Sequence, residues 1–214
     1  MATSGICNDD TVSPRPNLTE RRRREILEAA GSVIASRGIA ETRIADIARQ
    51  LGTSPALILY YFESKERLLL EALISSDRQF FAALEDRLAA CASAAERLRA
   101  LIDSSCPRDP DEAENQDEWL LWPAMWERAR HYPELGAERA RLDAQWRETI
   151  VDIVDGGIAT GEFVPVDTDA FAIQLSAMLD GLALQVILED PKVDAKAMRH
   201  LALQFASRSL GAEL

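Results

Sequence analysis

The chain has 214 residues, of which 47% are hydrophobic, so it is long enough to form one large or two small domains around a sizeable core. Ala, Leu, Arg and Glu are abundant whereas Gly and Pro are sparse, which favours an all-α fold over a sheet. The formal net charge of −12 argues, when taken alone, against a nucleic-acid partner.

The charge is distributed unevenly along the chain. Residues 15–67 contain ten Lys or Arg against seven Asp or Glu, a net charge of +3, whereas residues 76–214 contain 14 against 26, a net charge of −12. Because DNA is a polyanion, the N-terminal part can approach phosphates while the acidic remainder stays away from them. The uneven distribution therefore makes a nucleic-acid partner compatible with the first third of the chain.

The chain begins with a tail and a first helix. Residues 1–17 are small, polar and proline-containing, which is typical of a disordered tail. An amphipathic helix is predicted over about residues 19–37, because apolar residues recur at helical spacing and Gly38 supplies a stop. Residues 21–24 in its first turn are four consecutive arginines. Such a run is either a solvated surface or a set of phosphate contacts, and the next segment favours phosphate contacts.

Two short helices with a tight connection follow the first helix. Apolar residues at i, i+3, i+4 and i+7 indicate the first of them, which Thr42 can cap and Gly52 ends. Ser54 is a cap residue and Pro55 suits the first helical position, so a second helix begins at once and runs to about Phe62. This is helix-turn-helix spacing, in which the second helix can enter a DNA major groove. The alternative is that both helices pack in an all-helical core and bind nothing.

The run GTSPALILYYFESKERLLLEAL, residues 52–73, resembles the DNA-binding signature of the TetR family of one-component regulators. That signature has a glycine turn, a short recognition helix, an aromatic ending and a lysine in the same order. Within the family, the pattern S-P-x-x-I-x-x-Y-F is similar to the BetI type. The match covers about residues 20–75 well, although Ala56 and Leu59 differ from the residues that most relatives carry.

The second short helix and its flanks carry the candidate DNA contacts. Its hydroxyl groups can bond phosphates or base edges, and its small apolar side chains can touch thymine methyl groups. Because no Arg, Asn or Gln projects from it, we expect methyl contacts and DNA shape to set the sequence preference, with Arg43 and Lys65 fixing the register on phosphates. The candidate DNA-binding residues are Arg43, Thr53, Ser54, Pro55, Ala56, Leu57, Tyr60, Tyr61 and Lys65.

The middle of the chain is predicted to form one long helix, called the rod below, and three further helices. The rod is predicted over about residues 64–90, and one continuous helix of this length can transmit movement between two parts of a molecule. An S-x-x-E capping box begins the next helix, over about residues 93–105. After an acidic loop, a helical segment over residues 119–130 contains Pro123, where we expect a kink. Another helix is predicted over about residues 133–159.

Two long helices end the chain, over about residues 168–188 and 195–210, capped by Asp167 and Asp194. The first is apolar nearly all round, so it should be buried on two sides. The resemblance implies that the second buried side pairs with another copy, in a four-helix bundle built from the last two helices of each subunit. We expect a tail at 1–17, a helix-turn-helix domain at 18–66, and an effector-binding and dimerisation domain at 67–214.

The sequence contains few of the residue patterns that are typical of catalytic or metal-binding sites. The two histidines are isolated, and the sequence contains no H-E-x-x-H, G-x-S-x-G or phosphate-loop pattern, so we predict no enzyme, cofactor or metal. Cys7, Cys91 and Cys106 lack metal-site spacing, and their odd number disfavours a disulfide framework, which suits a cytoplasmic protein. Redox sensing through Cys91 and Cys106 is the alternative to idle thiols. We see no signal peptide, and charged residues such as Asp180 interrupt the longest apolar runs, so no membrane span is expected.

Aromatic residues gather late in the chain. Three tryptophans fall at i, i+3 and i+7 on one helix and the fourth lies on the next, either as bulky core filler or as the wall of a pocket. Aromatic faces beside carboxylates such as Glu118, Glu127 or Asp180 hold organic cations, whereas an apolar cavity equally suits a neutral lipophile. The candidate effector-binding residues are Trp119, Trp122, Met125, Trp126, Trp146 and Asp180.

Taken with the resemblance, these features predict a homodimeric repressor that binds double-stranded operator DNA and is released when a small molecule binds in its C-terminal body. The rod over residues 64–90 would be the lever, since an effector that changes DNA affinity must have its own affinity changed by the same factor. One alternative is an architectural DNA-binding protein without an effector. The other is an all-helical small-molecule enzyme.

Overall fold

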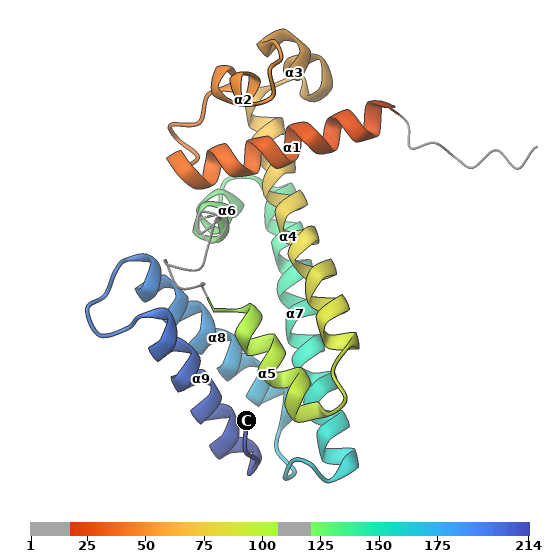
Figure 1. The fold of residues 1–214 in the computed structure, drawn as a ribbon, viewed down its shortest axis with the longest axis vertical. Helices are drawn as coiled ribbons and strands as arrows, with labels where there is room; N and C mark the ends of the chain where they lie inside the picture. Colours follow the sequence, from red (N-terminus) through yellow and green to blue (C-terminus); the bar gives the residue numbers. More distant parts are fainter. Residues whose placement is uncertain (1–17, 107–120) are drawn as a thin grey trace, which may run out of the picture.

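The computed structural model describes residues 18–106 and 121–214, and within these ranges the chain forms nine α-helices and no strand. The molecule is elongated, with α1 to α3 at one end and α5, α8 and α9 at the other (Figure 1). The all-α prediction is therefore confirmed for the described residues. The helices are α1 (Leu18–Arg37), α2 (Ile44–Gln50), α3 (Pro55–Phe62), α4 (Lys65–Ala89), α5 (Ala94–Ser104), α6 (Leu121–Ala129), α7 (Pro133–Thr160), α8 (Thr168–Ile187) and α9 (Ala195–Leu210).

Local capping chemistry determines where most helices begin. The side chains of Ser54, Ser64, Ser93, Asp167 and Asp194 each accept a hydrogen bond from a backbone N–H three residues later, as their positions before helical patterns predicted. These bonds satisfy backbone donors that have no partner within the helix. The boundaries of α3, α4, α8 and α9 consequently lie within a residue of those expected.

The start of α2 differs from its prediction. Arg43 is the N-cap and makes no side-chain capping bond, whereas Thr42 is completely buried. The Thr42 hydroxyl instead donates to the carbonyl of Gly38 at 2.8 Å, four residues back. Thr42 therefore closes the connection between α1 and α2 from inside the core.

The kink expected at Pro123 depends on residues outside the described ranges. Helix α6 is described from Leu121, so Pro123 lies in the first described turn. In a longer helix the residue at position 123 would bond to the carbonyl of residue 119, a bond that proline cannot make. The expected kink assumed a helix that continued upstream through residues 119 and 120, which lie outside the described ranges.

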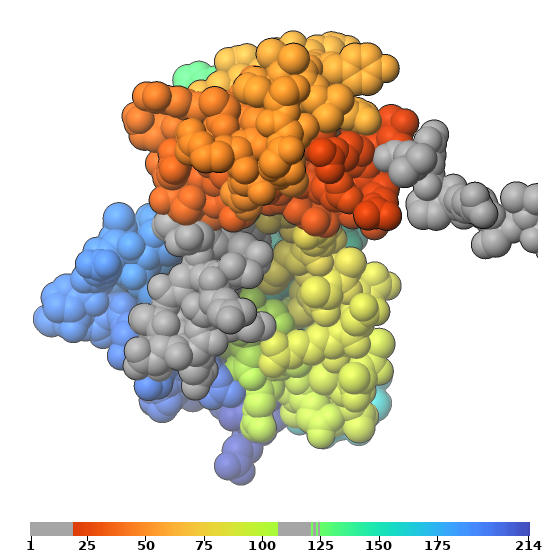
Figure 2. All heavy atoms as spheres, turned by 45° about the horizontal axis from the view of Figure 1, so that its top comes forward, coloured from red at the N-terminus to blue at the C-terminus, as the bar shows by residue number. Residues whose placement is uncertain are grey.

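The head, α1 to α3 with the start of α4, surrounds one apolar cluster. Ile26, Ile34, Ile47 and Ile58 are almost completely buried in it, and Phe62 closes it from the end of α3. The same cluster continues into residues of α6 and α7, which lie on the other side of α1 from α2 and α3 (Figure 1). In the space-filling view the head forms a continuous surface beside the body (Figure 2).

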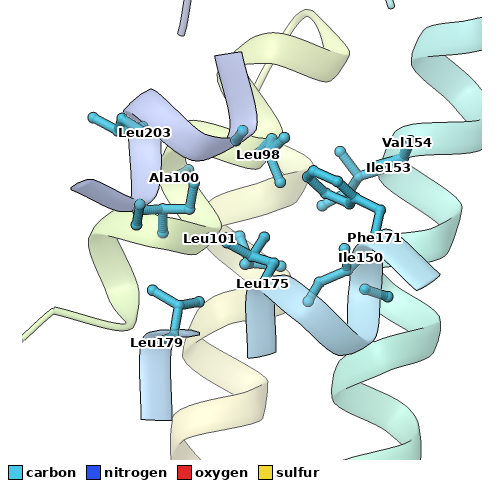
Figure 3. Close-up of a cluster of buried hydrophobic side chains, with 14 of the residues drawn as sticks. Leu98, Ala100, Leu101, Ile150, Ile153, Val154, Phe171, Leu175, Leu179 and Leu203 are labelled. Carbon is cyan, nitrogen blue, oxygen red and sulfur yellow. The ribbon is translucent and has the colours of Figure 1, made fainter. Parts of the chain in front are cut away.

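The body has a second apolar cluster. Leu98 and Leu101 of α5, Ile150 of α7 and Leu175 of α8 meet there and are fully buried (Figure 3). Only α4 and α7 contribute buried residues to both clusters among the described helices, α4 through Leu68 to Leu73 near the head and through Leu84 and Leu88 in the body. Two long helices, α4 and α7, therefore join the two cores.

The composition of α8 reflects its packing. With a mean hydropathy of 1.6 over its best window, α8 is long and apolar enough to cross a membrane by length and composition alone, although we expected Asp180 to prevent this. Phe171, Leu175 and Leu179 of α8 are buried in the body core, and the helix packs against both α7 and α9. In the single chain 33% of that window is buried, so these contacts account for one side of α8 while its other side stays exposed.

Two adjacent glycines near the end of α7 provide a test of this packing. A Cβ on Gly157 would lie 2.2 Å from the buried ring of Phe163, whereas a Cβ on Gly156 would meet no atom within 4 Å. We expect Gly157→Ala to lower the free energy of unfolding by about 1–3 kcal/mol through overpacking. The control Gly156→Ala should raise it by up to about 1 kcal/mol through helix propensity. Chemical denaturation followed by circular dichroism measures both, and equal effects of the two changes would contradict the packing.

Candidate functional site

The short helix α3 presents its side chains in two directions. Pro55 occupies its first turn and the Ser54 hydroxyl accepts the N–H of Leu57 at 3.2 Å, so the helix begins where the turn after α2 ends. Ile58 and Phe62, one turn apart, are buried against the head core. The opposite face is therefore free to meet another molecule.

Three side chains dominate this outer face. Ala56 is exposed, Leu59 is 39% exposed and Tyr60 is 79% exposed. Tyr61 is half-buried, and the edge of one tyrosine ring faces the other at a centroid distance of 5.4 Å. The positions i, i+3 and i+4 identify Leu59 as part of the face, a candidate contact that the sequence analysis did not select.

The other predicted DNA-binding residues surround α3. Thr53 and Leu57 are half-buried, and the Thr53 N–H donates to the carbonyl of Ala48 at 2.9 Å, which fixes the turn. Arg43 is exposed at the start of α2, and Lys65 is the half-buried first residue of α4. Arg43 and Lys65 therefore lie at the N-termini of the helices before and after α3, positions where a cation and backbone N–H groups together suit phosphates.

The arginine run in α1 is engaged mostly within the protein. Arg21 and Arg22 both pair with Glu25, at 3.0 and 2.8 Å, and these hydrogen bonds, Arg22 first, lower the pKa of the Glu25 carboxyl. Arg23 turns inward to Glu71 and to the main-chain carbonyl of Tyr61. Arg24 is exposed. Of the four arginines predicted to contact phosphates, Arg24 is therefore the one whose surroundings suit that role best.

The predicted tryptophan cluster is only partly described. Trp119 and the side chain of Trp122 lie outside the described residues. Met125 is buried in the head-side cluster and Trp126 is half-buried on α6. Trp146 is buried on α7, where its ring lies 6.1 Å from that of Phe80 and 6.3 Å from that of Phe81.

A buried carboxylate accompanies these aromatic rings. Asp77 of α4 is only 5% exposed, and it lies on the helix face of Phe80 and Phe81 by i, i+3 and i+4 spacing. An ionised carboxylate in such a place requires a compensating positive or hydrogen-bonding group. The sequence analysis missed Asp77, although an acid within the apolar stripe of a predicted helix was a visible signal.

The predicted carboxylate Asp180 lies nearby in the body. It is half-buried on α8, and burial, followed by repulsion from Asp143 of α7, raises its pKa to about 6. Asp143 is one turn from Trp146 on α7, and it pairs with Arg139 at 2.9 Å. Asp143 and Asp180 therefore lie close enough to repel each other, and Asp77 and Asp143 each lie one turn from an aromatic residue of their own helix.

Cys106 is an unreactive thiol by its surroundings. It is buried in the body, and burial raises its pKa to about 12. Since the thiolate is the reactive form, this environment opposes the redox-sensing alternative.

Comparison with known proteins identifies the two parts of the chain. Residues 26–72 match the family of bacterial regulatory proteins called the tetR family, and residues 94–211 match the C-terminal domain of BetI-type transcriptional repressors. Among curated relatives, the transcriptional regulator BetI of Cronobacter sakazakii is 28% identical over 203 residues, covering 92% of this chain and 95% of the relative. BetI of Rhizobium meliloti is also 28% identical, covering 93% of this chain and 94% of the relative.

Solved structures agree with this assignment. A protein of Saccharomonospora viridis, assigned as a transcriptional regulator and solved in complex with choline, superimposes with a TM-score of 0.83 at 34% identity, covering 89% of this chain and 98% of that one. A TetR regulator of Haloarcula marismortui has a TM-score of 0.77 at 24% identity, covering 89% and 99%. Because the BetI-type match alone spans more than half of the sequence, the chain belongs to the TetR family as a DNA-binding transcriptional repressor with a BetI-type C-terminal domain.

Proposed function

We propose that this repressor is released from its operator by an organic cation of the quaternary-ammonium class. The cation would bind in the body beside Trp146, with its charge balanced by Asp77 and Asp180. The observation that carries the proposal is the burial of Asp77 on the same face of α4 as two aromatic residues. A choline complex of a protein 34% identical to this chain supports the same ligand class.

The chemistry of the body favours a cation over a neutral lipophile. Aromatic faces attract cations that lack N–H donors, and desolvation strengthens that attraction. A carboxylate attracts a cation and offers nothing comparable to a neutral apolar chain. The excess of acidic residues beyond residue 76 also attracts cations from solution.

In this proposal the head, residues 18–66, contacts DNA. The body, residues 67–214, binds the effector and pairs with the body of a second copy, and the dimer works in the cytoplasm. Leu59 and Tyr60 would lie in the major groove, while Arg43 and Lys65 would contact phosphates on either side. Pairing is supported by the outer face of α8, where Ile173 is 58% exposed and Leu184 is 41% exposed. A twofold pair presents two copies of α3 to successive half-sites.

The phosphate role of Arg43 and Lys65 has a defined signature. We expect Arg43→Ala and Lys65→Ala each to weaken binding to DNA from upstream of the repressor's own gene, equally for all base variants of the site. Each should reduce the slope of log affinity against log salt concentration by about two, because the dimer loses one phosphate contact in each subunit. Fluorescence anisotropy measures both quantities, with Arg208→Ala on the exposed surface of α9 as the control. A loss confined to one base position would contradict the phosphate role.

The cation site predicts a pH dependence. Asp180 has a raised pKa of about 6, so it is mostly ionised at pH 7.5 and mostly protonated at pH 5. If the ionised form holds the cation, choline affinity measured by tryptophan fluorescence should fall about tenfold between pH 7.5 and pH 5. Asp180→Asn should remove this pH dependence, whereas Asn at the exposed Asp169 of the same helix should preserve it.

The buried anchor is tested separately at pH 7.5. Asp77→Asn removes the charge with little change of volume, and we expect at least about a 30-fold loss of choline affinity. Operator binding without choline should persist in this variant, but choline should no longer release the DNA. Release by fatty acids with no response to choline would instead establish the lipophile alternative.

A further inference from the structure

The guanidinium of Arg23 connects three helices. Its Nη1 donates to the main-chain carbonyl of Tyr61 at 2.6 Å, and its Nη2 forms an ion pair with Glu71 of α4. The guanidinium carbon lies 4.4 Å from the centre of the Phe62 ring, a cation–π distance. Arg23 therefore holds the end of α3 between α1 and α4.

The carbonyl that Arg23 binds lies where α3 most needs a partner. Tyr61 is in the last turn of α3, and carbonyls in the last turn lack helical donors. The next residues turn sharply, since Glu63 has a φ of 64° before Ser64 caps α4. A charged donor at Tyr61 therefore fixes the direction in which α3 ends and α4 begins.

The partner carboxylate extends the connection. Glu71 also accepts a hydrogen bond from Arg67 Nε at 2.8 Å, and Arg67 Nη1 donates to Glu134 of α7 at 3.1 Å. The Arg67–Glu134 pair is exposed, so it contributes little by itself. Arg23 and Glu71 are more enclosed, with side-chain exposures of 34% and 22%, so the stronger part of the network lies between α1, α3 and α4.

We propose that Arg23 is a positioning residue for operator recognition. It would orient the exposed face of α3, with Leu59 and Tyr60, through Tyr61 and Glu71 and would make no phosphate contact of its own. The role is independent of the effector, because it concerns the geometry of the head in the DNA-bound protein.

A phosphate contact is the competing role, because Arg23 also borders an open, polar cleft of about 590 Å³ whose lining includes Ser64 and Arg67. The two roles predict different salt dependence. A lost phosphate contact lowers the salt slope by about 0.9, whereas a lost positioning contact weakens specific binding and leaves the slope unchanged. The competing roles can therefore be separated without a DNA complex.

The experiment compares Arg23→Gln with Arg24→Gln in the full chain, on DNA from upstream of its own gene and on random DNA. Arg24 is an exposed arginine in the same turn, so its variant matches the loss of charge. We expect Arg23→Gln to lose at least about tenfold more operator affinity than Arg24→Gln, a loss typical of a charged hydrogen bond. Its salt slope should equal the wild-type slope, and its affinity for random DNA should stay within about twofold of the wild-type value, whereas Arg24→Gln, which removes a phosphate-facing charge, should lower both.

Hydrogen exchange gives a second readout without DNA. Amides of residues 57–64 should exchange faster in Arg23→Gln than in Arg24→Gln, because the end of α3 has lost its anchor. Arg23→Lys keeps the charge but cannot span Tyr61 and Glu71 together, so it should bind the operator as poorly as Arg23→Gln. Rescue by Lys, a salt slope lower by about two for the dimer, or equal losses in the Arg23 and Arg24 variants would each overturn the proposal.

Glu71→Gln tests the same bridge from its other end and remains informative if Arg23→Gln fails to fold. Since the two side chains act through one contact, the double variant should bind the operator within about twofold of the weaker single variant. Additive losses would overturn the proposal. Choline release is measured independently in each variant, so its failure would count against the effector proposal alone.

Discussion

The packing of α4 into two separate cores is the constraint on which this molecule depends. Leu68, Leu69 and Leu73 are buried in the head cluster, while Leu84 and Leu88 are buried in the body cluster. A continuous helix is stiff over this length, and close-packed interfaces move between discrete arrangements rather than deforming smoothly. Any rearrangement of the body around the second half of α4 therefore changes the position of its first half, which supports α3. The geometry makes the DNA-binding face and the body interior parts of one mechanical unit.

The head and the body of this unit differ in charge. The described head keeps exposed cations at Arg24 and Arg43, while the body carries the acidic excess. The arginines of the first turn of α1 show that a basic run is not a uniform surface, since three of the four are satisfied within the protein. Arg23, held by Glu71 and by the carbonyl of Tyr61, contributes orientation more than attraction, whereas Arg21 and Arg22 share the single negative charge of Glu25. Net charge thus locates the DNA-binding end, and specific pairing decides which cations remain available.

The sequence could predict whatever depends on neighbours within a few residues. Ser54 followed by Pro55 determines the start of α3, and glycines with positive φ, such as Gly38 and Gly161, end α1 and α7 as expected. Features that depend on distant residues could not be predicted in this way. Thr42 is drawn inside by a tertiary core, and the roles of Arg23 and Asp77 arise from contacts across 38 or more residues or from burial between helices. Periodicity shows which face of a helix is buried, but it does not show what a charged residue will meet there.

The position of Asp77 explains how a ligand could act on the rod. Asp77 lies on α4 between Leu73, the last buried α4 residue of the head cluster, and Leu84, the first in the body cluster. Opposite charges attract most strongly where water is excluded, so a cation bound beside Asp77 would stabilise whichever packing of α4 brings the two charges closest. If that packing differs from the one that suits DNA, the difference is the coupling free energy, and about 1–3 kcal/mol is enough to change operator occupancy roughly 5- to 150-fold. Because Asp77 lies between the two clusters on α4, a small displacement of α4 at this residue changes the packing of both the head cluster and the body cluster.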